Sequence, residues 1–204
     1  MIHTKDKIIE AAERLFAEQG YASTSLRQII AEAAVNLASV HYHFGSKERL
    51  LDDLVHRKAD PVNQARLSLL DASESKAAGR PLSVEQILNA FLLPTAKAAS
   101  ADPTFVRLMG RIHAEGLMPA IVQKHFLPTA QRFVSALRRA LPDLPEAEFL
   151  WRVHFMMGAM SYTMCGTPIF PAAIEDFHSR MEKLVRFLSA GFRAPAGNGE
   201  EKPA

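Results

Sequence analysis

The stretch SVHYHFGSK, residues 39–47, gathers side chains that donate and accept hydrogen bonds. His41, Tyr42 and His43 follow one another directly, and a glycine and a serine come soon after. Histidine and tyrosine on a surface suit contacts with phosphate oxygens or with the edges of bases. This use requires an element that points the rings outward.

A helical wheel of residues 37–44 shows that a short helix does so. At 100° per residue, with Val40 toward the core, Phe44 falls beside Val40, whereas Ala38 and Tyr42 point away. Small residues at the start of the outer face permit close approach to a partner, and the hydrogen-bonding rings follow. Two turns are not stable alone, so neighbouring helices must hold this one in place.

The preceding residues predict two such helices. Apolar residues from Ile8 to Phe16 recur at helical spacing, and Gly20 ends that helix. Thr24 or Ser25 can cap a second helix, whose inward stripe runs from Leu26 to Ala33. The third helix is capped by Asn36, flanked by the hydrophobic staple of Val35 and Val40, and a fourth is capped by Ser46 with Leu50, Leu51, Leu54 and Val55 inward.

The rest of the chain keeps helical periodicity, and no run of alternating β-branched residues indicates a strand. Most prolines after Asp60, Pro61 included, are expected at helix starts or between helices, with kinks at Pro94 and Pro128. The sequence therefore predicts an all-α chain in three parts. Residues 1–58 form a helix-turn-helix domain, residues 59–192 a larger helical domain, and residues 193–204 a flexible tail.

Composition excludes several classes of protein. The 204 residues are 48% hydrophobic, enough for a substantial core. A single cysteine excludes an internal disulfide framework, and neither a signal peptide nor an apolar run of membrane-spanning length is present. We therefore expect a soluble, cytoplasmic protein with no membrane partner, no metal and no cofactor. The net charge of +2 is too small to argue for a nucleic-acid partner.

The spacing of the second and third helices matches a helix-turn-helix, which places its second helix in the major groove of DNA. Helix starts at Ser25 and Ser46 offer free N–H groups to phosphates. The alternative is structural, because short helices with a polar face are common.

The motif GYxxTS followed by VNxxxVxYHFxSKExL resembles the DNA-binding domain of the tetracycline-repressor (TetR) family over about residues 5–55. The resemblance implies a dimeric repressor that binds an operator in double-stranded DNA and has a C-terminal domain for a small ligand. In two departures, Ala34 stands where the family usually has a turn glycine, and Leu37 replaces a commonly polar position, which favours contact with thymine methyl groups. The implied DNA-binding residues are Ser25, Arg27, Asn36, Leu37, Ala38, Ser39, His41, Tyr42 and Lys47.

The larger domain is rich in flexible apolar side chains. Residues 149–164 are apolar on nearly every face, which predicts a helix buried both by its own core and by a partner subunit. The resemblance places the homodimer interface on the last two long helices, about residues 145–165 and 171–192, with apolar faces from Leu150, Met157, Met160, Leu184 and Leu188. We expect a cavity for a small apolar ligand, lined by Phe91, Met109, Ile112, His113, Phe126, Phe133, Trp151 and Phe155.

Ordinary core packing explains single methionines equally well, and His113 can be a satisfied core or interface histidine. The segments FVRLMGR and WRVHFMMG, together with the third helix, are similar to a branch of the family associated with fatty-acid metabolism. That similarity implies a fatty acid or an acyl-CoA as the ligand.

Two rival functions remain. An enzyme would need a nucleophile and a base, but Cys165 and His154 on one helix would lie about 16 Å apart, and no catalytic motif is present. We therefore predict that the chain is not an enzyme. The second rival is a helical adaptor protein without DNA binding.

Overall fold

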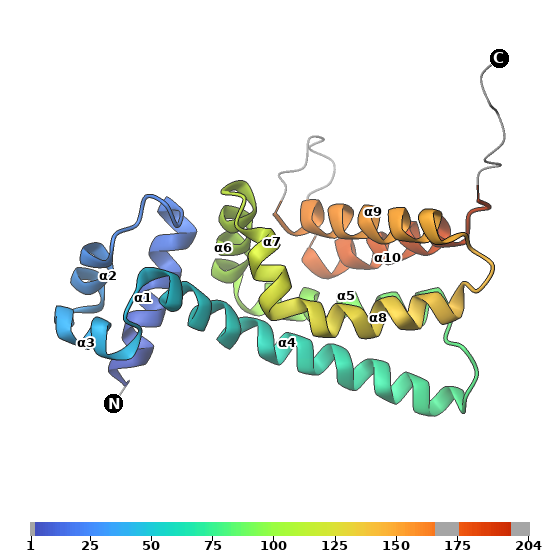
Figure 1. Ribbon diagram of the computed structural model, residues 1–204, viewed down its shortest axis with the longest axis horizontal. Coiled ribbons are helices and arrows are strands. Elements are labelled where there is room, and N and C mark those ends of the chain that lie inside the picture. Colours follow the sequence, from blue (N-terminus) through green and yellow to red (C-terminus); the bar gives the residue numbers. More distant parts are fainter. Residues whose placement is uncertain (1–2, 166–175, 197–204) are drawn as a thin grey trace, which may run out of the picture.

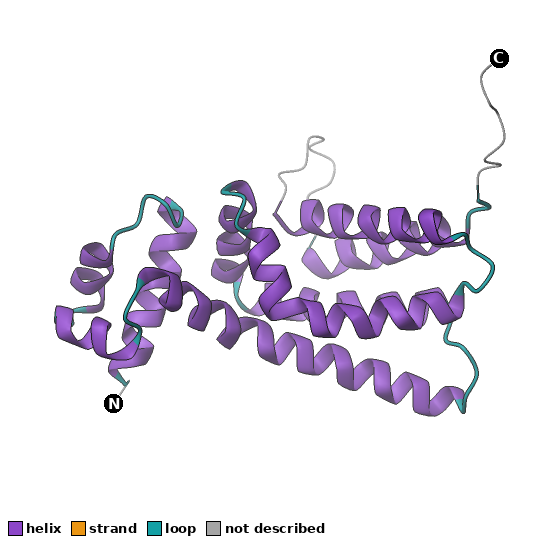
Figure 2. Cartoon of the chain, in the orientation of Figure 1, coloured by secondary structure: helices purple, strands orange, loops and turns teal. Residues whose placement is uncertain are grey.

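The computed structural model describes residues 3–165 and 176–196, and in these ranges the chain is helical with no strand (Figures 1 and 2). This confirms the predicted fold class. The helices are α1 (Thr4–Gln19), α2 (Leu26–Ala33), α3 (Leu37–His43), α4 (Lys47–Ala77), α5 (Val84–Ala101), α6 (Pro103–Ala114), α7 (Met118–Ile121), the π-helix η1 (Val122–Phe126), α8 (Leu127–Ala140), α9 (Glu146–Cys165) and α10 (Phe177–Arg193).

The helices α1, α2 and α3 form a compact unit at one end of the molecule, which we call the front unit (Figure 1). Its apolar stripes lie inward as the sequence predicts, with Ile8, Phe16, Ile29 and Val40 fully buried. Thr24 also reaches inward, and its hydroxyl donates to the carbonyl oxygen of Gly20 at 2.7 Å. These contacts hold the short helix α3, which is too short to be stable by itself.

The helix α4 does not end where the first domain was expected to end. It continues from Lys47 to Ala77 through Pro61, which lies inside the helix and not at a helix start. Proline removes the hydrogen bond that its own N–H would make to the carbonyl of Arg57, and its ring crowds that carbonyl. Buried residues on both sides of Pro61, among them Ala59 and Asn63, hold the helix together. A single helix therefore runs from the front unit along the whole larger domain (Figure 1).

Two hydrophobic clusters make up the core. The boundary between them does not fall at residue 58, the predicted end of the first domain. The first joins the front unit to the start of α4 and to residues of α6, among them Phe105, Leu108 and Ile112. The second is formed by α5, α8, α9, α10 and the distal part of α4. The helix α6 thus belongs by sequence to the larger domain and by packing to the front core.

Two prolines and the start of the last helix can also be compared with the sequence predictions. Pro94 lies inside α5 as expected, but Pro128 occupies the first turn of α8, where its missing N–H is harmless. The helix α10 begins at Phe177 after its cap Asp176, and residues 171–175 of the predicted span lie outside the described residues, as do residues 197–204 of the tail. Among the described helices, none is long and apolar enough to cross a membrane.

Candidate nucleic-acid interface and internal cavity

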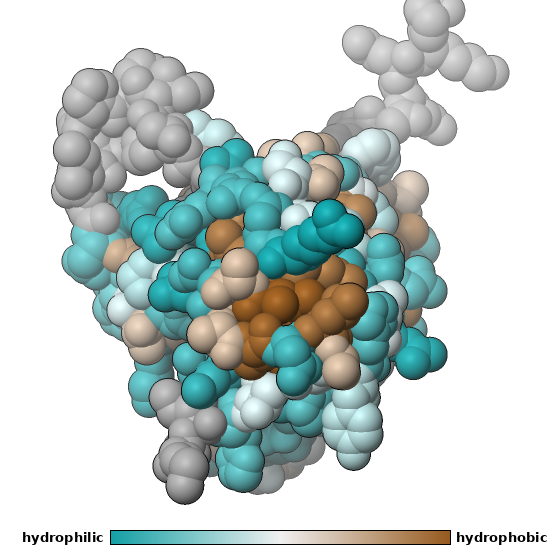
Figure 3. Space-filling view, turned by 90° about the vertical axis from the view of Figure 1, so that its left-hand side faces the viewer, coloured by the Kyte–Doolittle hydropathy of each residue, from teal (hydrophilic) through white to brown (hydrophobic). Residues whose placement is uncertain are grey.

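The outer face of α3 is presented to solvent. Val40 and Phe44 are buried beneath it, whereas Tyr42 is 85% exposed and Leu37 is 53% exposed. Ala38 and His41 are exposed as well, and Ser39 is half-buried. The wheel therefore predicts correctly which side chains face outward. Figure 3 views the molecule from this end and shows apolar atoms near the middle of a largely hydrophilic face.

The caps of α2 and α3 use some of the predicted DNA-binding oxygens. Asn36 Oδ1 accepts from the backbone N–H of Ser39 at 2.8 Å and from the Ser39 hydroxyl at 2.9 Å. Ser25 forms a capping box with Gln28, in which the Ser25 hydroxyl oxygen accepts from the Gln28 backbone N–H at 3.3 Å and Gln28 Oε1 accepts from the Ser25 backbone N–H at 2.7 Å. The side chains of Asn36 and Ser25 therefore cap the starts of α3 and α2.

The turn between α2 and α3 contains Ala34 at the position where the family usually has glycine. Ala34 adopts the left-handed conformation, with φ 51° and ψ 48°, although it is not glycine. The N–H of Val35 bonds to the carbonyl of Ile30, and the N–H of Ala34 bonds to that of Ala31, which is the Schellman pattern. The chain thus keeps the left-handed turn, at a cost to alanine of about 1 kcal/mol.

Lys47 is bound within the front unit. Its Nζ donates to the carbonyl oxygens of Tyr21 and Thr24, both at 2.8 Å, and lies 4.2 Å from the centre of the Tyr21 ring. Burial and the neighbouring Glu48 carboxylate raise the pKa of Tyr21 to about 12, so its hydroxyl stays protonated and donates to Glu48. Lys47 therefore ties α4 to the turn before α2, a structural role that the sequence did not predict.

Other basic side chains at this end are exposed. Arg27 and His41 are exposed and form no hydrogen bond or ion pair with the part of the chain that the structure describes. The same holds for Arg49, which lies beside the turn at Gly45 and was not among the predicted residues. Its place in the first turn of α4, two residues after Lys47, could have suggested it.

A large internal cavity lies between α4, α5, α6, α9 and the α7–α8 segment, with a volume of about 840 Å³. This is within the usual range for sites that bind small organic molecules. Its lining is mostly apolar and includes Met109, Met157, Met160 and Met164. Polar groups in the lining come from Arg66, Thr95, His113, Gln123, His154 and Ser161.

Half of the residues predicted to line such a cavity do line it, namely Phe91, Met109, His113 and Phe126. His113 Nδ1 lies 3.4 Å from the Ser161 hydroxyl. Ile112 and Phe133 are instead buried within the two core clusters. Trp151 and Phe155 were placed wrongly, because they lie on the outer side of α9 and are more than half exposed. A helix that is apolar on every face does not reveal which side faces inward.

Arg66 is a charged residue of the cavity that was not among the predicted lining residues. It lies on α4, is 4% exposed, and burial lowers the pKa of its guanidinium to about 10. It donates to the carbonyl oxygen of Phe91 at 2.9 Å, to Asn63 Oδ1 at 3.2 Å and to the Thr95 hydroxyl at 2.7 Å. The signal was its spacing from the apolar residues Ala59 and Leu70, which puts it on the inner face of α4.

The helix α6 lies between this cavity and the front unit. Phe105, Val106, Met109 and His113 of α6 line the cavity, while Phe105, Leu108, Met109 and Ile112 pack in the front core. Figure 1 shows α6 standing between α1 and the helices of the larger domain. The helix α6 is therefore in contact with both the cavity and the front core.

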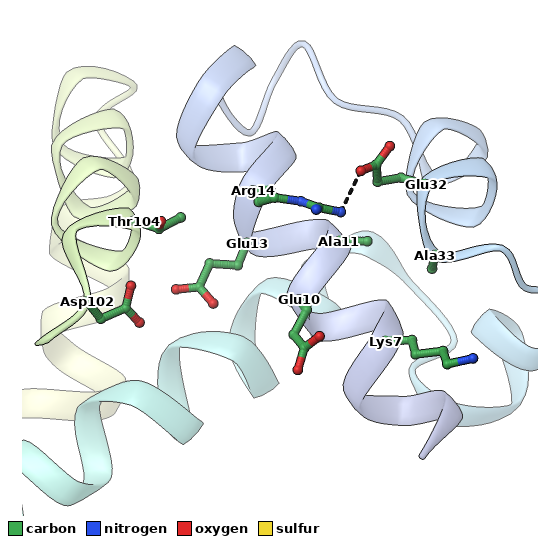
Figure 4. A pocket seen from close by; sticks show the side chains of 9 residues that line it. All are labelled: Lys7, Glu10, Ala11, Glu13, Arg14, Glu32, Ala33, Asp102 and Thr104. Atoms are coloured by element: carbon green, nitrogen blue, oxygen red, sulfur yellow. Dashed lines mark hydrogen bonds and ion pairs between the residues drawn. The ribbon is translucent and has the colours of Figure 1, made fainter. Parts of the chain in front are cut away.

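Polar contacts fix both ends of α6 to the front unit. Before its first turn, Asp102 and Glu13 of α1 face each other across a polar groove (Figure 4), and Lys58 Nζ bridges them at 2.5 and 2.8 Å. Burial raises the pKa of Glu13 despite the hydrogen bond from Lys58. After its last turn, the Glu115 carboxylate accepts from the backbone N–H of Ala22 at 2.9 Å.

At the C-terminal end of α6, the Glu115 side chain lies against Gly20 in the turn after α1. A Cβ on Gly20, whose φ is +90°, would lie 2.2 Å from Glu115 Oε1. Arg111 adds a third contact by donating to the carbonyl oxygen of Glu18 at 3.0 Å. The turn between α1 and α2 is thus built around the end of α6.

Several large apolar side chains of α9 and α10 are exposed. Trp151 and Phe155 of α9 stack on each other with ring centroids 5.6 Å apart, and Phe187 of α10 is 71% exposed. Leu150 and Tyr162 are also more than half exposed. We call these five residues the α9–α10 patch. Of the residues predicted for a dimer interface, only Leu150 belongs to it, because Leu184 and Leu188 are buried and Met157 and Met160 line the cavity.

Two family models match the chain. One, described as "Bacterial regulatory proteins, tetR family", matches residues 8–54, and the other, "Tetracyclin repressor-like, C-terminal domain", matches residues 89–191. The regulator LmrA of Bacillus subtilis is 38% identical over 77 residues, which are 37% of this chain and 41% of LmrA. The negative regulator IcaR of the icaADBC biofilm operon in Staphylococcus aureus is 41% identical over 59 residues, 29% of this chain and 32% of IcaR. The chain therefore aligns with less than half of either relative.

Solved structures match over nearly the whole chain and show the same fold. A tetR family transcription regulator from Shewanella sp. PV-4 superposes with a TM-score of 0.69 at 20% identity, covering 93% of this chain and 98% of that one. The fatty acid degradation regulator FadR from Bacillus halodurans gives 0.64 at 16% identity, covering 96% and 99%. These matches are to transcriptional regulators, as predicted, and not to enzymes. The chain belongs to the tetracycline-repressor family of DNA-binding transcriptional regulators.

Proposed function

We propose that this protein is a dimeric repressor that binds a near-palindromic operator through α3 and is released by a small apolar ligand in the cavity. The observation that carries the DNA-binding part is the outer face of α3, where Ala38, His41 and Tyr42 are exposed above a fully buried Val40. Small residues near the start of α3 allow close approach to base edges, and Tyr42 and His41 reach phosphates or bases. Leu37, exposed beside them, suits the methyl group of thymine.

The α9–α10 patch supports the dimer. Its members Leu150, Trp151, Phe155 and Phe187 are large apolar side chains that are each more than half exposed, and exposed apolar surfaces of this kind mark interfaces. A two-fold axis through the patch would pair α9 and α10 with their copies. Two copies of α3 would then read two half-sites about one helical turn, ~34 Å, apart.

The position of α6 supports release by a ligand. One side of this helix lines the cavity and the other packs on α1, so an occupant that displaces α6 also moves the front unit. A ligand weakens operator binding only when it prefers the arrangement that does not bind DNA. A coupling of about 1–3 kcal/mol would weaken DNA binding about 5- to 150-fold.

The apolar lining supports a ligand with a hydrocarbon chain, such as a fatty acid or an acyl-CoA. Each buried CH₂ group adds about 0.8 kcal/mol of affinity. The structural similarity to FadR, a regulator of fatty acid degradation, agrees with this choice. The methionines of α9 adapt easily to chains of different shape.

A gel-shift assay with DNA from upstream of the protein's own gene tests the DNA-binding part. We expect a discrete complex that unlabelled specific DNA removes and unrelated DNA does not. The absence of any specific complex would favour a helical adaptor, the alternative function. Titration with salt adds a second check. A substitution that removes one phosphate contact should reduce the magnitude of the slope of log affinity against log salt concentration by about one unit.

A further inference from the structure

Arg66 is a buried cation without a counter-ion among the described residues. Its three hydrogen-bond acceptors are a backbone carbonyl, an amide oxygen and a hydroxyl, all of which are neutral. The three carboxylates of α4 that follow Lys58 are bound to other groups: Asp60 to Gln64, Asp71 to Arg132, and Glu74 to Arg132 and Arg139. Burying a charge without a counter-ion costs free energy, so a bound anion would stabilise the buried guanidinium of Arg66.

The guanidinium also keeps donors free and is held in a fixed orientation. It has five N–H groups, and the three bonds use one each on Nε, Nη1 and Nη2. One N–H on each terminal nitrogen is therefore left. The Phe91 ring lies 4.1 Å from the guanidinium carbon, and together with Thr95 and Asn63 it holds the guanidinium in place. A planar group with two remaining donors matches the two oxygens of a carboxylate.

The surroundings of Arg66 indicate what kind of anion fits. The cavity that it lines is predominantly apolar, with Val62 from α4, Phe91 and Ala98 from α5, and Met157, Met160 and Met164 from α9. Such a lining does not suit a multiply charged polar metabolite, because most of its charges would be buried without partners. A single carboxylate on a hydrocarbon body satisfies both the guanidinium and the lining.

We propose that Arg66 binds the carboxylate of an apolar monocarboxylic acid whose hydrocarbon part fills the rest of the cavity. This inference rests on the proposed function, in which the cavity is the ligand site, and adds that the ligand is a free acid. An acyl thioester lacks the terminal carboxylate that Arg66 requires, and a neutral ester or alcohol offers it no charge.

The test compares decanoate with methyl decanoate by isothermal titration calorimetry on the full-length protein. A charge-assisted hydrogen bond contributes about 1.5–3 kcal/mol, so the acid should bind about 10- to 150-fold more tightly than the ester. Arg66→Met should lower the affinity for decanoate to that for the ester and leave the ester unchanged. Thr95→Val is the matched control, because it removes one hydrogen bond to Arg66 and keeps the charge.

The outcomes separate this inference from the proposed function. Equal affinity for acid and ester in the wild-type protein would overturn the role of Arg66 while leaving an apolar ligand in place. Failure of both compounds to bind would overturn the ligand class of the cavity, and with it this inference, whether or not DNA binding is observed. The wild-type comparison needs no variant, so it decides the question even if Arg66→Met does not fold.

Discussion

The Glu115 carboxylate accepts a hydrogen bond from the backbone N–H of Ala22 at 2.9 Å. Glu115 follows the last residue of α6, and the next residue, Gly116, lines the cavity. Ala22 lies in the turn that leads into α2. One hydrogen bond thus joins the wall of the cavity to the base of the helix-turn-helix.

Removing this bond should weaken the coupling between the cavity and DNA. In Glu115→Ala the N–H of Ala22 turns to water, so the fold should lose at most about 1 kcal/mol. The factor by which a bound ligand weakens operator affinity should move toward one. Fluorescence anisotropy of a labelled operator, with and without decanoate, measures that factor. Glu115→Gln keeps an acceptor oxygen and should behave like wild type. An unchanged factor in Glu115→Ala would show that this hydrogen bond does not contribute to the coupling between the cavity and DNA.

Tyr42 and Lys47 should respond differently to truncation. Tyr42 is exposed and makes no contact with the core, so Tyr42→Ala should weaken operator binding and leave thermal unfolding unchanged. Lys47 binds two backbone carbonyls, so Lys47→Ala should both weaken operator binding and lower the melting temperature. Calorimetry beside a binding titration separates the two effects. Wild-type operator affinity in Tyr42→Ala would show that the outer face of α3 does not contact DNA.

The left-handed alanine before α3 offers a stability test. Because glycine adopts this conformation without steric cost, Ala34→Gly should stabilise the fold by about 0.5–1 kcal/mol in urea unfolding, after its larger unfolded-state entropy is subtracted. Ala78 has φ 49° at the end of α4, so Ala78→Gly should act in the same direction. Ala31→Gly, inside α2, should destabilise by up to about 1 kcal/mol. Destabilisation by Ala34→Gly as large as that by Ala31→Gly would contradict the turn geometry.

The α9–α10 patch should hold the dimer. Replacing Phe155 and Phe187 together by glutamate puts four charges into a two-fold interface, which should give a monomer in sedimentation velocity at micromolar concentration. The control is Leu69→Glu, since Leu69 is an exposed leucine on α4 outside the patch. It should leave the dimer intact. A wild-type monomer, or a dimer that survives both glutamates, would refute the assignment.

The front unit could be predicted almost completely from the sequence because its signals are local. Stripes at helical spacing, the caps Asn36 and Ser46, and the wheel around Val40 all agree with the structure. Lys47 is the exception. Its partners Tyr21 and Thr24 are more than twenty residues away, so no local pattern reveals that its charge is used inside the protein.

The larger domain was harder to predict, for two physical reasons. The apolar residues of α9 surround the helix, so periodicity could not separate the cavity side, with Met157 and Met160, from the exposed side, with Trp151 and Phe155. The packing of α6 on α1 joins residues about ninety positions apart, which only the fold brings together. Pro61 shows the converse error, because packing on both sides of it overrides a local stop signal.

The most direct test of the central claim, that the cavity controls DNA binding, is a titration of the labelled operator complex with carboxylic acids of increasing chain length. If the hydrocarbon chain supplies the affinity, each added CH₂ should lower the concentration that releases DNA by about fourfold, until the cavity is full. By linkage, the operator should weaken acid binding by the same factor. Release by short polar metabolites, with no effect from any acid that calorimetry shows to be bound, would contradict the account.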